Sequence, residues 1–84
     1  MPHTHWQLLD RVKTALPRLP PAEQRVGQLV LDDPAGFARL PVSAIAHQAG
    51  VSTPTVVRFC RSLGYDGLTD FKEKLAAQLA AGHT

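Results

Sequence analysis

Prolines and glycines divide this chain into short segments, and this punctuation limits its fold more than any other feature of the sequence. The 84 residues include seven prolines and six glycines. Proline lacks the backbone N–H that a helix interior or a central strand needs, so regular elements must end near it. No segment alternates apolar and polar residues for long enough to predict a strand, whereas several carry apolar residues at helical spacing. We therefore expect an all-α fold of short helices.

The first two segments predict amphipathic helices. The first helix opens at Thr4 or His5 and ends near Pro17. Its inward stripe is Trp6, Leu9, Val12 and Leu16. The second helix starts at Pro20-Pro21, and Glu23 complements the positive end of its dipole. Its stripe is Ala22, Val26, Leu29 and Val30, spaced i, i+4, i+7 and i+8.

A short helix and a helical pair follow. Asp33 is expected to cap a helix over Pro34–Arg39, which carries Phe37 and Leu40 inward. Beyond Pro41, two short helices are expected over Val42–Ala49 and Thr53–Leu63.

The last helix is predicted from about Leu68 to Ala80, with Asp66 as its N-cap. Its inward residues are Leu68, Phe71, Leu75 and Leu79. We expect one domain over residues 1–80, a bundle of five to six helices, and a frayed tail over residues 81–84.

The stretch VSAIAHQAGVSTPTVVRFCRSL, Val42 to Leu63, predicts a helix-turn-helix. Such a motif needs two helices at a steep angle, joined by a short turn that often contains glycine. Gly50 can take the positive φ of that turn, and Ala46 is small where the second helix approaches. Apolar contacts are offered in register by Ile45, Ala49, Val51, Val56, Phe59, Cys60 and Leu63.

The second helix of this motif then presents a polar side. Ser52 is expected to cap it, and burial of Val56 and Phe59 turns Thr53, Val57, Arg58 and Arg61 outward. Hydroxyls can bond base edges, a valine can pack on a thymine methyl, and arginine can bind guanine or phosphate. The expected DNA-contacting residues are Ser52, Thr53, Thr55, Val57, Arg58, Arg61 and Lys72.

The charge distribution supports this interpretation. The net charge is only +2, but no carboxylate occurs between Asp33 and Asp66, a window that holds Arg39, Arg58 and Arg61. Such a window can carry a positive field. The alternative is a helical protein-interaction or dimerisation module without a nucleic-acid role, in which these arginines are merely solvated. An exposed Val57 without a structural purpose favours DNA.

Other function classes have little support. His3, His5, His47 and His83 lack metal-ligand spacing, and no catalytic triad or phosphate loop is present, so neither a metal, a cofactor nor an enzyme is predicted. Cys60 lies on the buried stripe, where its pKa should rise. No apolar run approaches the roughly 18 residues of a membrane span, so we expect a cytoplasmic protein.

The runs LPPAEQRVGQLVLD, from Leu19, and AGVSTPTVVRFCRSLGYDGLTDFK, from Ala49, resemble the DNA-binding domain of RpiR-type bacterial transcriptional regulators. The resemblance implies a winged-less, homeodomain-like helix-turn-helix that binds double-stranded DNA as a homodimer on an inverted-repeat operator. It also implies a sugar-isomerase-type domain, outside this chain, that senses phosphosugars or amino-sugar phosphates.

This sequence departs from the RpiR pattern at two helix starts and one basic position. Pro20, and Pro41 with Ala44, replace residues that cap helices in the family, at about 1 kcal/mol each. Ser62 replaces a frequent lysine. For the dimer, we expect the apolar residues beside Trp6 to meet a second copy, together with the last helix. The residues concerned are Leu8, Leu9, Leu75 and Leu79.

Overall fold

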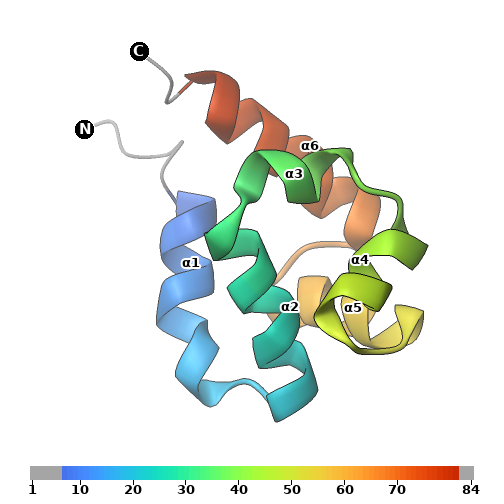
Figure 1. Ribbon diagram of the computed structural model, residues 1–84. Helices are drawn as coiled ribbons and strands as arrows, with labels where there is room; N and C mark the ends of the chain where they lie inside the picture. The colour runs from blue at the N-terminus through green and yellow to red at the C-terminus, as the bar shows by residue number, and fades with distance from the viewer. Residues whose placement is uncertain (1–6, 82–84) are drawn as a thin grey trace.

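The computed structural model describes residues 7–81, and every regular element in this range is helical (Figure 1). The elements are α1 (Gln7–Ala15), the 3₁₀ turn η2 (Leu16–Arg18), α2 (Pro21–Asp32), α3 (Pro34–Arg39), α4 (Val42–Ala49), α5 (Thr53–Ser62) and α6 (Leu68–Ala81). The all-α prediction is confirmed. Across these residues, no helix combines the length and the apolar character that a membrane crossing demands. The expected helix start at Thr4 or His5, the stripe residue Trp6 and residues 82–84 lie outside the described range.

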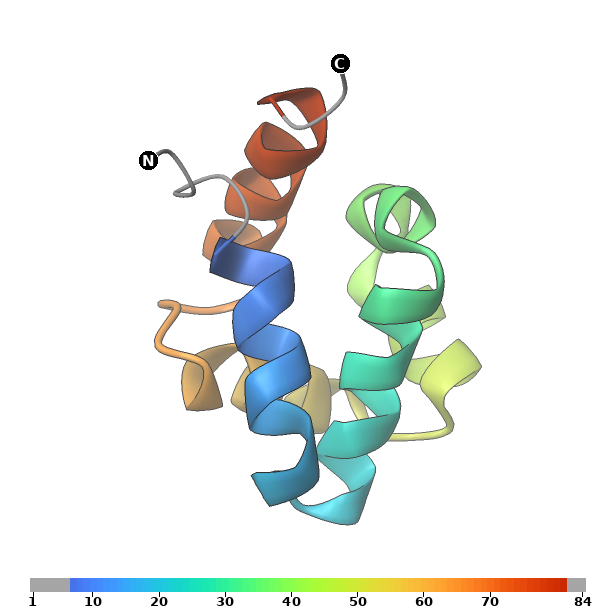
Figure 2. The ribbon, with the colours of Figure 1, turned by 90° about the vertical axis from the view of Figure 1, so that its left-hand side faces the viewer.

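α1 and α2 run antiparallel, side by side (Figure 2). α1 ends at Ala15, and Pro17 lies within η2, as its missing N–H predicts. The buried stripe of α1 differs from the prediction, because Leu8 is buried with Val12 whereas Leu9 is only half-buried. This register places the first turn of α1 against α6, a long-range contact that helical periodicity does not encode.

The core is centred on Phe71 of α6. Phe37 and Phe59 each approach its ring edge-on with centroids 5.6 Å away, and Tyr65 does so at 5.2 Å. Aromatic pairs favour this T-shaped arrangement. Because the three rings come from α3, α5 and the segment between α5 and α6, one side chain joins three parts of the chain. The predicted inward positions of Phe37 and Phe71 are confirmed.

The start of α6 is organised by Asp70 rather than by Asp66. α6 begins at Leu68, so Gly67 and not Asp66 directly precedes it, and the predicted N-cap role of Asp66 is wrong. The backbone N–H of Asp66 instead donates to Asp70 Oδ2 at 3.0 Å. Asp70 occupies the third position of the helix, from which a carboxylate can reach back to the preceding turn. Asp70 also pairs with Lys74 one turn later, and this hydrogen bond lowers the pKa of Asp70.

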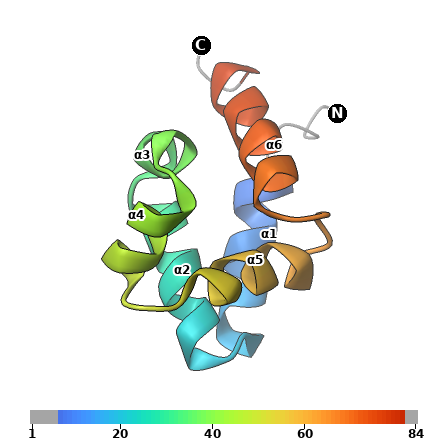
Figure 3. The ribbon, with the colours of Figure 1, turned by 90° about the vertical axis from the view of Figure 1, so that its right-hand side faces the viewer.

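α4 and α5 are joined by the turn Gly50–Ser52, and α5 lies across α2 (Figure 3). α5 also packs against α4 and α6, so three other helices hold its buried side in place. Pro20 and Pro41 precede α2 and α4 without a side-chain cap, as expected. The stability of the helix-turn-helix therefore depends on packing more than on capping.

Candidate nucleic-acid interface

The turn between α4 and α5 has the geometry that the sequence predicts. Gly50 ends α4 in the left-handed conformation, with φ 72° and ψ 35°, which glycine adopts at little cost. Its N–H donates to His47 O at 3.2 Å, and Val51 N–H donates to Ala46 O at 2.9 Å. These bonds satisfy carbonyls at the end of α4. Ala46 is 5% exposed and so belongs to the core, in which α4 packs against α5 and α2.

Complete burial of one side of α5 determines what the other side presents. Val56, Phe59 and Cys60 have no exposed surface. Thr53, Arg58 and Arg61 are exposed, and Val57 is partly exposed. The prediction that these four residues share an outward side is therefore confirmed, whereas their contacts with DNA stay predictions.

Thr55 does not belong to this outward side. It is only 9% exposed, and its Oγ1 lies 2.9 Å from Ser52 Oγ in a hydrogen bond. Two residues of helix rotate a side chain by about 200°, which carries Thr55 away from the exposed Thr53. The structure thus places Thr55 inward with its hydroxyl bonded to Ser52, while its expected contact with DNA stays a prediction.

Ser52 is exposed at the start of α5 but does not cap it. Its hydroxyl bonds to Thr55 instead of a backbone amide of the first turn, so the predicted cap is also wrong. The backbone carbonyl of Ser52 also accepts from the N–H groups of Thr55 at 3.1 Å and Val56 at 3.4 Å, so side-chain and backbone bonds together tie the turn to α5. Ser52 stays in the expected contact set because of its exposure.

The two arginines of α5 differ in their surroundings. Arg58 is exposed and takes part in no ion pair within residues 7–81. Arg61 is exposed as well, but its Nε donates to the backbone oxygen of Asp66 at 3.1 Å. Arg58 is therefore the more available cation, and Arg61 keeps only its terminal nitrogens for an outside partner.

Lys72 has a structural contact that the sequence did not predict. Its Nζ donates to the backbone oxygen of Leu40 at 2.5 Å, and its side chain is half-buried. Leu40 follows α3 directly, so Lys72 fastens α6 to the chain just before α4. The structure thus gives the ammonium group an internal partner in place of the expected phosphate.

Two polar contacts hold the C-terminal end of α5, and the sequence did not predict them. Glu23, placed in the first turn of α2 as predicted, is buried and accepts a hydrogen bond from Ser62 Oγ at 2.8 Å. Arg11 Nη1 donates to Leu63 O at 3.2 Å, and its guanidinium lies 5.3 Å from the centre of the Tyr65 ring. Acids are common at helix starts and arginines are common on exposed turns of helices. Their presence in the sequence therefore does not indicate which partner they bind.

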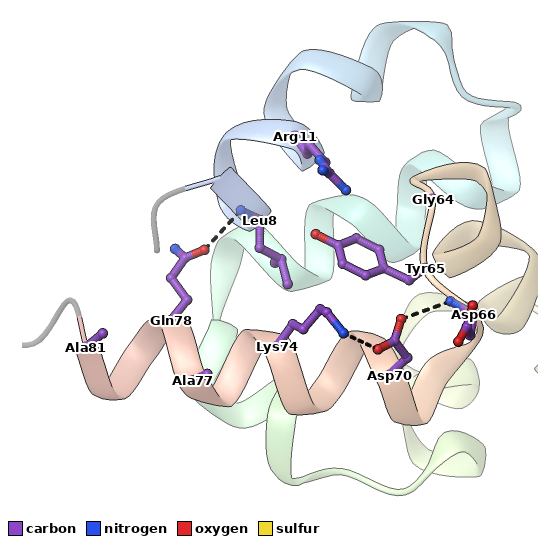
Figure 4. Close-up of a pocket in the computed structure, with 10 residues that line it drawn as sticks. All are labelled: Leu8, Arg11, Gly64, Tyr65, Asp66, Asp70, Lys74, Ala77, Gln78 and Ala81. Carbon is purple, nitrogen blue, oxygen red and sulfur yellow. Dashed lines mark hydrogen bonds and ion pairs between the residues drawn. The ribbon is translucent and has the colours of Figure 1, made fainter. Parts of the chain in front are cut away.

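A groove of about 720 Å³ lies between α1, α6 and the segment that links α5 to α6 (Figure 4). Its charged residues have both signs, and two of them, Asp70 and Lys74, pair with each other. Burial raises the pKa of Tyr65, which lines it. Its described lining contains no serine, cysteine or histidine that could act as a nucleophile or base.

Cys60 is a buried free cysteine. Burial raises the pKa of the Cys60 thiol to about 12, so the reactive thiolate is scarce at neutral pH. Within residues 7–81, no three His, Cys, Asp or Glu side chains are grouped to hold a metal ion.

The apolar surface expected to meet a second copy is smaller than predicted. Leu75 has no exposed surface and Leu8 is 4% exposed, so both belong to the core. Leu9 and Leu79 are half-buried. The prediction is wrong for Leu8 and Leu75, because both are buried in the core and α1 packs against α6.

The family model described as a helix-turn-helix domain of the rpiR family matches residues 6–82. Among relatives, a bifunctional protein glk of Paraburkholderia xenovorans is 49% identical over 72 residues, which make up 86% of this chain and 11% of that protein. The HTH-type transcriptional regulator HexR of Pseudomonas aeruginosa is 41% identical over 75 residues, 89% of this chain and 26% of HexR. The chain thus spans only a small part of either relative.

A solved structure has the same fold. The crystal structure of the N-terminal domain of ybbH from Bacillus subtilis superimposes with a TM-score of 0.83 and 32% sequence identity. The match covers 87% of this chain and 89% of the ybbH domain.

Proposed function

The chain belongs to the rpiR family of helix-turn-helix domains, and we propose that it acts as the sequence-specific DNA-binding domain of a bacterial transcriptional regulator. The main support is the asymmetry of α5. One side is fully buried, while the other presents hydroxyl, apolar and cationic groups. A helix of this kind can enter the major groove while the surrounding structure holds it in place.

Within this proposal, each exposed residue of α5 has a distinct role. Thr53, in the first turn, and Arg58, further along, contact base edges, with Arg58 suited to the paired acceptors of guanine. Val57 packs on a thymine methyl group. Ser52 and Arg61 flank this set and bind backbone phosphates, which fix the register of the helix on the duplex.

The assembly and the control of the regulator are further parts of the proposal. Two copies bind the halves of an inverted repeat, since two-fold operators match two-fold proteins. The relatives' greater length and the resemblance to RpiR-type regulators support a sensor of phosphorylated sugars outside these residues. Because the bacterial chromosome is the partner, the domain works in the cytoplasm, and DNA binding rather than catalysis is its activity.

Selection of bound sequences from a random DNA pool tests the proposal. We expect an enriched motif, whose symmetry and spacing report the dimer. Arg58→Ala should then weaken binding to the selected duplex by roughly 1 to 3 kcal/mol, while Lys13→Ala on α1 serves as a control that removes an equal charge elsewhere. A chain that binds no duplex at low salt would contradict the proposal and favour the protein-interaction alternative.

A further inference from the structure

An arginine outside the helix-turn-helix lies against its turn. Arg25 belongs to α2, is exposed, and holds its Nη1 3.9 Å from the position that a Cβ on Gly50 would occupy. Gly50 is the residue at which α4 ends and the turn to α5 begins. The packing of α2 against both α4 and α5 sets this approach, so it depends on the fold and not on sequence proximity.

The guanidinium of Arg25 has no carboxylate partner in the part of the chain that the structure describes. The ion pair there joins Lys74 to Asp70 on α6. The nearest acid along α2 is Glu23, which is buried and engaged with Ser62. The segment that follows the turn carries no acid before Asp66. Arg25 therefore adds an uncompensated positive charge to the turn.

Resting on the proposed function, we infer that Arg25 binds a DNA backbone phosphate beside the start of α5. Gly50 precedes Ser52 by two residues, which span at most about 7 Å of chain. When the start of a recognition helix enters a major groove about 12 Å wide, the turn that leads into it comes close to a groove edge, and phosphates line that edge. A guanidinium presented there contacts phosphate while Arg58 reaches the bases.

This assignment extends the DNA-binding surface from the helix-turn-helix to α2. It adds a cation on α2, beside the turn into α5, to Arg58 on α5 itself. A phosphate contact carries no base preference, so it should strengthen binding to all sequences equally.

The test compares the 84-residue wild-type chain with Arg25→Gln, Arg25→Lys and the control Lys13→Gln. Binding to a mixed-sequence duplex and to a duplex from the selection is measured by fluorescence anisotropy between about 50 and 200 mM salt. Arg25→Gln should weaken both complexes by about 3- to 10-fold and make the slope of log K against log salt shallower by about 0.9. Arg25→Lys should restore the slope, and Lys13→Gln should change neither quantity. Circular dichroism confirms that each variant is folded.

Each other outcome overturns a specific statement. If Arg25→Gln matches the wild type while Arg58→Ala loses binding, Arg25 does not contact DNA and the proposed function stands. A change of preference at one base pair would make Arg25 a base-reading residue, contrary to the inference. An equal change of the salt slope in Lys13→Gln would show that the slope reports net charge and not a contact of Arg25 with phosphate, which would also overturn the inference. Failure of the wild type to bind any duplex overturns the proposed function as well.

Discussion

Replacement of Gln78 should destabilise the domain more than its place on α6 suggests. Its side chain is 6% exposed, and Oε1 accepts a hydrogen bond from the backbone N–H of Leu8 at 3.1 Å (Figure 4). The same oxygen accepts from the N–H of Leu9 at 3.3 Å. These amides belong to the first turn of α1, where no intrahelical acceptor is available. One side chain thus caps the first turn of a helix through Leu8, which lies 70 residues earlier in the sequence.

Gln78→Leu keeps the approximate shape of the side chain but removes the acceptor. Two neutral hydrogen bonds contribute about 1 kcal/mol each, and the Leu8 bond is buried, so we expect a loss of about 2 kcal/mol in the free energy of unfolding. For a domain of this size the melting temperature should fall by about 8 to 16 °C. Urea and thermal unfolding, followed by the helical circular dichroism signal, measure both quantities.

Two matched variants separate capping from other effects. Gln48→Leu, at an exposed position of α4, should stay within about 0.5 kcal/mol of the wild type. Gln78→Glu retains an acceptor beside the positive end of α1 and should lose less than Gln78→Leu. The reasoning is refuted if Gln78→Leu is as stable as the wild type, or if Gln48→Leu loses as much.

Three further variants test other parts of the structure. Gly50→Ala should lower the free energy of unfolding by about 1 kcal/mol, because φ is 72° while the new Cβ meets only Arg25 at 3.9 Å; an unchanged urea midpoint would contradict this. Lys72→Gln should cost about 1 kcal/mol of stability and leave the salt dependence of DNA binding unchanged, and a shallower slope would return Lys72 to the contact set. Cys60 should resist iodoacetamide until urea unfolds the chain. Burial raises the pKa of the folded thiol from 9.0 to about 12, so between these values the unfolded chain loses the proton while the folded chain keeps it. The free energy of unfolding should therefore fall as the pH rises through this range, and it should fall less in Cys60→Ala, which has no thiol.

The sequence alone determined the helices and the motif. Helix ends follow from prolines and from Gly50, whose need for a left-handed conformation is a property of one residue. The buried stripe of α5 follows from a period of 3.6 residues, so the outward placement of Thr53, Val57 and Arg58 could be predicted without coordinates. These features depend on residues that are neighbours in the sequence, and such residues stay close in space in any fold.

Tertiary structure decided which polar side chains are available to a partner. Lys72 donates to the carbonyl of Leu40, 32 residues away, and Gln78 accepts from the first turn of α1, 70 residues away. Arg25 acquired its place beside Gly50 only when α2 packed against α4. Each of these outcomes joins residues through the rotation of one helix against another, or through competition among several acceptors. Sequence spacing carries no record of either, because the energy that selects a long-range partner exists only after the core has formed.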